Sequence, residues 1–161
     1  MAILLDILRH GYAVPMDGSG DRGRRLSPQG LAELGRLAQE LSREGWRPDR
    51  IFSSPFLRAT ETAAFLSRAA GGTVPVEILE ALEPDGDPPG VLRALAFRGI
   101  AEGHVLIVGH QPLLGRLVAH LTGSERGLAP GSLVRVECPA GMEPGNGTVV
   151  RTIRPAEPGG A

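Results

Sequence analysis

Short apolar runs alternate with helix-like segments along most of this chain, and that alternation limits the folds open to it. The strand-like runs lie at 3–8, 50–53, 74–79 and 105–108. The segments between them have apolar residues at helical spacing and lie at 28–42, 56–69, around Leu92 and Leu95, and at 113–121. Strands that alternate with helices favour a parallel sheet with helices on both faces. We therefore expect a three-layer α/β/α domain with a mostly parallel sheet.

Local signals support these boundaries. Ser27 and Asp87 have the side chains of helix N-caps, and Gly123 ends the last of the expected helices. Two further strand-like runs, 132–138 and 148–153, surround a loop rich in Gly and Pro. We expect these two strands to pair antiparallel at or near an edge of the sheet.

The length of 161 residues suits one domain with its own core. We expect that domain to span 1–154 and residues 155–161 to form a flexible tail. The formal net charge is −1, so the chain shows no sign of the basic surface of a nucleic-acid partner. All 17 basic residues are Arg. Any anion site here must therefore use guanidinium groups, which bind phosphate bidentately.

Cysteine and histidine spacing predicts neither a metal nor a cofactor. Cys138 is the single cysteine, which excludes an intrachain disulfide and a multi-Cys zinc site, and the four His show no HExxH spacing. The apolar runs are too short to cross a bilayer, and the start of the sequence lacks the pattern of a signal peptide. We therefore expect a cytoplasmic protein without a membrane partner.

Arg and His residues follow three of the expected strands. The first is followed by Arg9 and His10, and the strand at 105–108 is followed by Gly-His110-Gln-Pro. The strand at 50–53 leads into "SSPFLR", which places Arg58 in the first turn of its helix. In open α/β sheets, ligands bind outside the carboxyl ends of the strands. If these strands are neighbours, two His and two Arg meet in one pocket.

Such a pocket suits a phosphate dianion. Guanidinium groups and the start of a helix near Pro112 both attract anions. Cationic neighbours lower the pKa of a His, which keeps its imidazole neutral and nucleophilic near pH 7. A neutral His inside an Arg cage supports phosphoryl transfer without a metal. Each motif alone also fits a structural role, but three such motifs at separate strand ends point to one site.

The motifs resemble those of the histidine phosphatase superfamily, which has the phosphoglycerate-mutase-like fold, and above all its small SixA-type phosphohistidine phosphatases. The matching stretches are "ILRHGYA" at 7–13, "RRLSPQG" at 24–30, "SSPFLRATET" at 53–62, "EILEALEPDGD" at 77–87 and "VLIVGHQPLLG" at 105–115. The likeness extends to about Val136, and the motifs are specific as a set.

The resemblance implies a role for each residue of the pocket. His10 matches the nucleophile that accepts the phosphate, and Arg9, Arg58 and His110 match the rest of the catalytic phosphate pocket. Arg24 matches a further basic residue that contacts phosphate. The backbone at Gln111 is a candidate for one more contact.

The general acid is where the match weakens. The Glu that larger family members use aligns with Ala81, which lies between Glu80 and Glu83. Glu80, Glu83, Asp87 or no residue at all are the alternatives. A phosphoramidate can protonate its own nitrogen, so its imidazole leaves easily. A phosphohistidine phosphatase therefore needs a general acid less than an ester phosphatase does.

Too few residues separate Glu83 from His110 for the helical lid of the mutases, so we expect no lid subdomain and an open site. The main hypothesis is a monomeric, metal-independent phosphatase that forms a phosphohistidine intermediate. Its expected partner is a phosphorylated protein, such as an HPt-type phosphorelay domain. An open-site phosphatase for small phosphate esters is the alternative. A non-catalytic phosphate-binding or docking module fits less well, because the His and Arg set is intact.

Overall fold

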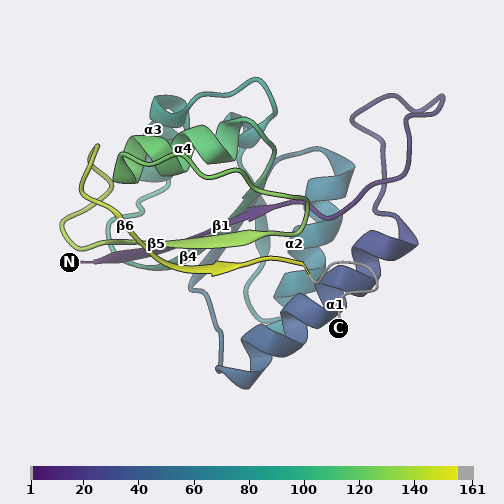
Figure 1. Cartoon of the computed structure of the whole chain (residues 1–161), viewed down its shortest axis with the longest axis horizontal. Helices are drawn as coiled ribbons and strands as arrows, with labels where there is room; N and C mark the ends of the chain where they lie inside the picture. Colours follow the sequence, from purple (N-terminus) through teal and green to yellow (C-terminus); the bar gives the residue numbers. More distant parts are fainter. Residues whose placement is uncertain (1, 156–161) are drawn as a thin grey trace.

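The computed structural model describes residues 2–155, which form a six-stranded sheet with helices on both faces (Figure 1). In chain order the elements are β1 (Ile3–Arg9), α1 (Pro28–Arg43), β2 (Arg50–Ser53), α2 (Leu57–Ala69), β3 (Val76–Ile78), the 3-10 helix η1 (Glu80–Leu82), α3 (Pro88–Phe97), β4 (Gly103–Gly109), α4 (Leu113–Thr122), β5 (Leu133–Cys138) and β6 (Thr148–Ile153). The predicted α/β/α class is confirmed. The tail predicted at 155–161 lies, apart from Pro155, outside the described residues.

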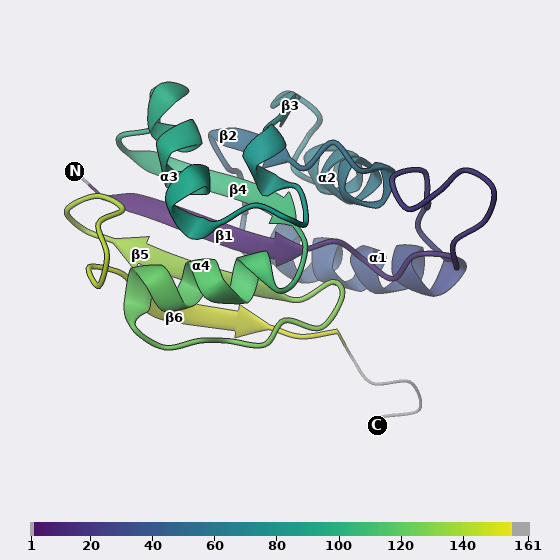
Figure 2. The ribbon, with the colours of Figure 1, turned by 90° about the horizontal axis from the view of Figure 1, so that it is seen from above.

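The sheet is parallel except at one side. Its strand order is β3-β2-β4-β1-β5-β6, and β3, β2, β4 and β1 are parallel. β5 pairs antiparallel with β1, and β6 pairs antiparallel with β5. Figure 2 shows β1, in purple, between β4 and β5. Both the mostly parallel sheet and the antiparallel pairing of the last two strands were predicted correctly.

Two hydrophobic cores fix the sheet between its helical layers. α3 and α4 cover one face of the sheet, and α1 and α2 cover the other (Figures 1 and 2). Leu95 of α3 and Leu117 of α4 are fully buried in one core, and Leu34 of α1 and Leu66 of α2 are fully buried in the other. Burying one such side chain contributes about 1.5–3 kcal/mol. Helices anchored in this way set where each strand ends and where the next helix begins.

The helix starts follow the predicted caps. The Oγ of Ser27 accepts the Gly30 N–H at 3.1 Å, and the Oδ1 of Asp87 accepts the Gly90 N–H at 2.7 Å. These bonds satisfy N–H groups that have no partner within the helix. Gly123 ends α4 with a φ of 83°, a conformation that glycine adopts without steric cost.

β3 is shorter than the strand predicted at 74–79. The Leu79 N–H still bonds to Ser53 O of β2, but the chain then turns into η1. That turn carries Leu82 into the core under α3 and α4, where its side chain is fully buried. The period-two pattern of a strand does not anticipate this turn, because the gain comes from packing against distant helices.

The carboxyl ends of β1, β2 and β4 lie level with one another. Arg9 pairs with Gly109, and Ser53 pairs with Val108. The residues that follow these three strands therefore meet at one edge of the sheet, as predicted. Among residues 2–155, no helix combines the length and the apolar character needed to cross a bilayer.

Candidate active site

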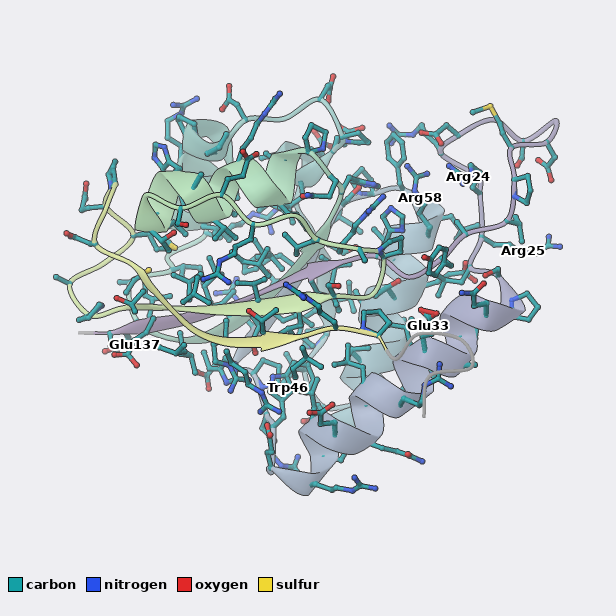
Figure 3. The ribbon with its side chains drawn as sticks, viewed as in Figure 1. Arg24, Arg25, Glu33, Trp46, Arg58 and Glu137 are labelled. Atoms are coloured by element: carbon teal, nitrogen blue, oxygen red, sulfur yellow. The ribbon has the colours of Figure 1, made fainter. Side chains whose placement is uncertain are left out.

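The predicted phosphate-site residues meet in one pocket at this edge of the sheet. The pocket has a volume of about 200 Å³. Its walls include all six residues that the sequence indicated, namely Arg9, His10, Arg24, Arg58, His110 and Gln111. Figure 3 shows Arg58, from α2, near Arg24, from the loop that precedes α1. Tyr12, Ala13, Pro84 and Pro130 complete the lining.

His10 is held in one tautomer. Its Nδ1 lies 2.7 Å from the carbonyl oxygen of Gly11, which can only accept a hydrogen bond. The hydrogen is therefore on Nδ1, and Nε2 keeps its lone pair. The Nε–H of Arg58 donates to that Nε2 at 3.2 Å.

Burial and charge keep His10 neutral. Its side chain is 8 % exposed. Burial first, and then the charges of Arg58, Arg9 and Arg24, lower the pKa of His10 to about 4, although its bond to Gly11 acts in the opposite direction. At pH 7 the pocket therefore contains an unprotonated imidazole nitrogen beside guanidinium groups.

Gly11 allows the chain to leave β1 close to α1. A Cβ at this position would lie 3.2 Å from a methyl carbon of Leu26 and 3.4 Å from one of Leu34. The Gly11 N–H donates to the Oγ1 of Thr62 on α2. These contacts fix the carbonyl that orients His10.

His110 faces the pocket from the end of β4. Its ring centroid lies 5.0 Å from that of His10 and 5.1 Å from that of Phe56. The Nε2 of His110 lies 2.8 Å from the Oγ of Ser54, whereas Nδ1 is buried without a hydrogen-bond partner among the described residues. Burial first, and then the electrostatic effect of the adjacent His10 and Arg58, lower the pKa of His110 to about 3.

The guanidinium groups are held by backbone and carboxylate oxygens. Arg9 donates from Nη1 to Leu128 O at 2.8 Å, and Arg24 donates from Nε to Val14 O at 2.9 Å. Arg58 is only 6 % exposed and contacts both the backbone and the carboxylate of Asp21. The result is a cluster of three fixed cations around two neutral imidazoles, which suits a doubly charged tetrahedral anion.

The N-terminus of α4 offers fewer free N–H groups to an anion than the sequence predicted. The Leu114 N–H bonds to His110 O, and the Gly115 N–H is capped by the Oε1 of Gln111 at 2.7 Å. The side chain of Gln111 therefore satisfies the helix end. Its backbone remains a candidate for phosphate contact.

None of the three acid candidates lines the pocket. Glu80 lies in a separate groove beside Phe97 and Arg98. The Oε1 of Glu83 forms an ion pair with the Nη1 of Arg22 at 2.5 Å, and Asp87 is occupied as the cap of α3. Among residues 2–155 there is also no group of three His, Cys, Asp or Glu side chains arranged to hold a metal ion.

Sequence reasoning missed two residues at this site. Ser54 contacts His110, and Asp21 contacts Arg58 and Arg24. Ser54 lies within a motif that the sequence indicated, so its hydroxyl beside the strand end was a usable signal. Asp21 lies in a polar loop without periodicity, and its place depends on tertiary contacts.

Comparison with known proteins agrees with this geometry. Residues 5–83 match the family described as histidine phosphatase superfamily (branch 1). The phosphohistidine phosphatase SixA of Escherichia coli strain K12 is 36 % identical over 122 residues, which cover 74 % of each chain. The chain belongs to the histidine phosphatase superfamily. It is thus an enzyme, a SixA-like hydrolase.

Further relatives and solved structures are similar to this chain. A SixA homologue of Haemophilus influenzae is 37 % identical over 127 residues, covering 73 % of this chain and 76 % of that one. The structure of the protein histidine phosphatase SixA complexed with tungstate aligns with a TM-score of 0.80 at 32 % identity, over 94 % of this chain and 97 % of that one. The native structure of mycobacterial glucosyl-3-phosphoglycerate phosphatase aligns with a TM-score of 0.69 at 20 % identity, covering 98 % of this chain and all of that one, and shares the fold.

Proposed function

We propose that this protein is a metal-independent phosphatase that removes phosphate from phosphohistidine on another protein. The observation that carries the proposal is the state of His10, a buried neutral imidazole whose Nε2 lone pair lies beside Arg58. A neutral nitrogen within a cluster of cations can attack a phosphoryl group whose charge those cations offset. A relative that shares more than a third of its aligned residues is named a phosphohistidine phosphatase.

The first step transfers the phosphoryl group to His10. The Nε2 of His10 forms a bond to phosphorus while the bond from phosphorus to the substrate nitrogen breaks. The electron pair of that bond remains on the nitrogen that leaves phosphorus. The other ring nitrogen of the substrate imidazole carries a proton, so the leaving group is a neutral imidazole. Arg9, Arg24 and Arg58 stabilise the charge on the phosphoryl oxygens.

The second step returns the enzyme to its starting state. Water attacks phosphorus on phosphorylated His10, the bond from phosphorus to Nε2 breaks, and inorganic phosphate takes the protons of the water. His110 assists both steps. The Oγ of Ser54 accepts the Phe56 N–H and lies 2.8 Å from the Nε2 of His110. In the proposed mechanism the Ser54 hydroxyl donates its hydrogen to this Nε2, and the Nδ1 of the neutral imidazole carries the hydrogen that binds a phosphoryl oxygen.

The surroundings of the pocket favour a protein substrate with a good leaving group. Only η1, α3 and β4 lie between Ile78 and His110, so no helical lid closes over the site. Neither Glu80 nor Glu83 lines the pocket, and an alkyl ester would need such an acid. On this basis the proposed substrate is phosphohistidine on a protein such as an HPt-type domain. The proposal keeps the cytoplasmic location and the monomeric state expected from the sequence.

Turnover of matched substrates tests the proposal. We expect kcat/KM to be much higher for a phosphohistidine-bearing protein and for aryl phosphates than for alkyl phosphates such as phosphoglycerate. His10→Ala should remain folded and lose essentially all activity. Rapid quench of the wild type should trap acid-labile, base-stable phosphate. His120→Ala, on the far part of α4, is the control and should retain activity.

Two results would contradict the proposal. Substantial activity in folded His10→Ala would exclude the covalent intermediate. Alkyl esters that react as fast as phosphohistidine, together with loss of both activities in Glu83→Gln or Glu80→Gln, would show a working general acid. The small-ester alternative would then replace the protein substrate. We expect each Glu→Gln change to lower phosphohistidine turnover by less than about tenfold.

A further inference from the structure

Arg58 forms hydrogen bonds at both ends of its guanidinium group. Its Nε donates to the Nε2 of His10 at 3.2 Å. Its Nη1 donates to the backbone oxygen of Asp21 at 2.8 Å, and its Nη2 lies 3.3 Å from the Oδ2 of Asp21. One end of the group therefore faces the imidazole and the other end faces a single acidic residue.

Asp21 is held where it can do this. Its Oδ1 also pairs with the Nη1 of Arg24 at 3.2 Å, and its backbone oxygen accepts the Arg24 N–H. The next residue, Arg22, accepts the Leu57 N–H at its backbone oxygen and forms the ion pair with Glu83. The loop is thereby tied to the start of α2, beside Arg58.

We propose that Asp21 is a positioning residue. It binds the Nη atoms of Arg58 and so orients the Nε–H toward His10 and the incoming phosphoryl group. This inference rests on the proposed function. A guanidinium group on a long side chain has many rotamers, and its planar shape makes orientation decisive for binding phosphate. Asp21 selects one orientation before the substrate arrives.

The contacts favour positioning over competition with substrate. Asp21 contacts the Nη atoms of Arg58, whereas the Nε–H bonds to the Nε2 of His10, the atom that attacks phosphorus in the proposed mechanism. The Nε–H can therefore pass from His10 to a phosphoryl oxygen while Asp21 stays on the Nη atoms. The Asp21 side chain is 41 % exposed and is not among the residues that line the pocket, so it can remain on Arg58 while the pocket fills. A competing carboxylate would instead occupy the edge that faces the nucleophile.

The test compares Asp21→Asn with Asp17→Asn. Asp17 lies in the same loop, but its carboxylate bonds to Ser19 within the loop. We expect Asp21→Asn to lower kcat roughly ten- to hundredfold, the scale of a small misplacement, and to change KM for an aryl phosphate far less. Asp17→Asn should match the wild type. In an Arg58→Lys background, Asp21→Asn should cause no further loss, because its effect passes through the guanidinium group.

A readout without turnover separates this inference from the proposed function. The ¹⁵N shift of His10 Nε2 reports the hydrogen bond from Arg58, and we expect it to move in Asp21→Asn but not in Asp17→Asn. If the wild type hydrolyses no phosphorylated substrate, the proposed function is wrong, and this shift alone decides the role of Asp21.

Three outcomes would overturn the inference. The first is an unchanged His10 shift in Asp21→Asn. The second is a lower KM and tighter tungstate binding at unchanged kcat, which would identify Asp21 as a competitor for Arg58. The third is an effect of Asp21→Asn that adds in full to that of Arg58→Lys.

Discussion

Asp6→Asn should destabilise the fold strongly without changing the active site. Asp6 is fully buried in the middle of β1 and joins three side chains from separate segments. The Nε of Arg135 donates to its Oδ1 at 2.7 Å, and the Nε1 of Trp46 donates to its Oδ2 at 2.8 Å. The Nε2 of His104 lies 2.5 Å from the same Oδ2. Trp46 places this cluster on the face that α1 covers (Figure 3).

The size of the effect follows from these contacts. An amide keeps the shape of the carboxylate, and its oxygen can still accept the Arg135 Nε–H. Its NH2 group then faces the indole N–H of Trp46, and Arg135 loses its counter-charge. Removing one partner of a buried charge pair costs about 3–5 kcal/mol. The stability of a folded domain is typically about 5–15 kcal/mol, so this loss is a large share of it.

Urea unfolding followed by far-ultraviolet circular dichroism measures this loss. A loss of about 3 kcal/mol should lower Tm by roughly 6–12 °C. Glu137→Gln, which removes an exposed carboxylate from β5, is the matched control and should stay within about 0.5 kcal/mol. An unfolding free energy of Asp6→Asn that is equally close to the wild type would refute the reasoning.

The pH dependence of stability gives an independent check. Burial alone would raise the pKa of Asp6, but hydrogen bonds from His104, Arg135 and Trp46 outweigh burial and lower it. A carboxyl whose folded pKa lies below its unfolded pKa of about 4 stabilises the fold above pH 4. That contribution disappears as the pH falls through the folded pKa. Asp6→Asn should therefore remove part of the acid sensitivity of the wild type.

Three predictions concern the site. Burial and the neighbouring Arg side chains lower the pKa of His10 to about 4. The fall of kcat/KM at low pH should therefore have its midpoint near pH 4, measured with an aryl phosphate and corrected for ionisation of the substrate. A midpoint near pH 6.5, the ordinary value for His, would contradict a buried neutral imidazole. Ser54→Ala should lower kcat about tenfold, because His110 Nε2 loses its contact with the Ser54 hydroxyl. The hydroxyl of Ser53 donates to a backbone carbonyl instead, so Ser53→Ala should leave kcat unchanged. Equal losses in the two variants would exclude a specific role for Ser54. Excess EDTA should leave turnover unchanged and tungstate should inhibit competitively; activity lost on chelation and restored by one divalent ion would show that the site needs a metal.

Local signals were sufficient for most of the fold. Ser27 and Asp87 cap their helices as predicted, because an N-cap depends on a side chain and an N–H three residues later. The alternation of strands and helices was enough to predict the parallel sheet. η1 was missed, since its stability comes from burying Leu82 under helices that are distant in the sequence.

The convergence of the site was also predictable, because the carboxyl ends of parallel strands meet at one edge. Arg9 ends β1, His10 and His110 directly follow β1 and β4, and Arg58 lies in the first turn of the helix after β2. The structure brings all four into one pocket. The roles implied for them remain predictions. Asp21 was not predictable, because the loop that carries it is placed by long-range bonds such as the one from the Leu57 N–H to Arg22 O.

The chemistry of the two imidazoles depends on atoms that no motif specifies. "RHG" and "GHQP" indicate two His near a phosphate site, but each His can present either of two nitrogens. The carbonyl of Gly11 leaves the Nε2 of His10 as the one with a lone pair. The Oγ of Ser54 lies 2.8 Å from the Nε2 of His110, whose Nδ1 has no hydrogen-bond partner among the described residues. Two different oxygens thus contact opposite nitrogens of the two rings, Nδ1 of His10 and Nε2 of His110, and this difference is the basis on which we propose a nucleophile and a hydrogen-bond donor from the same residue type.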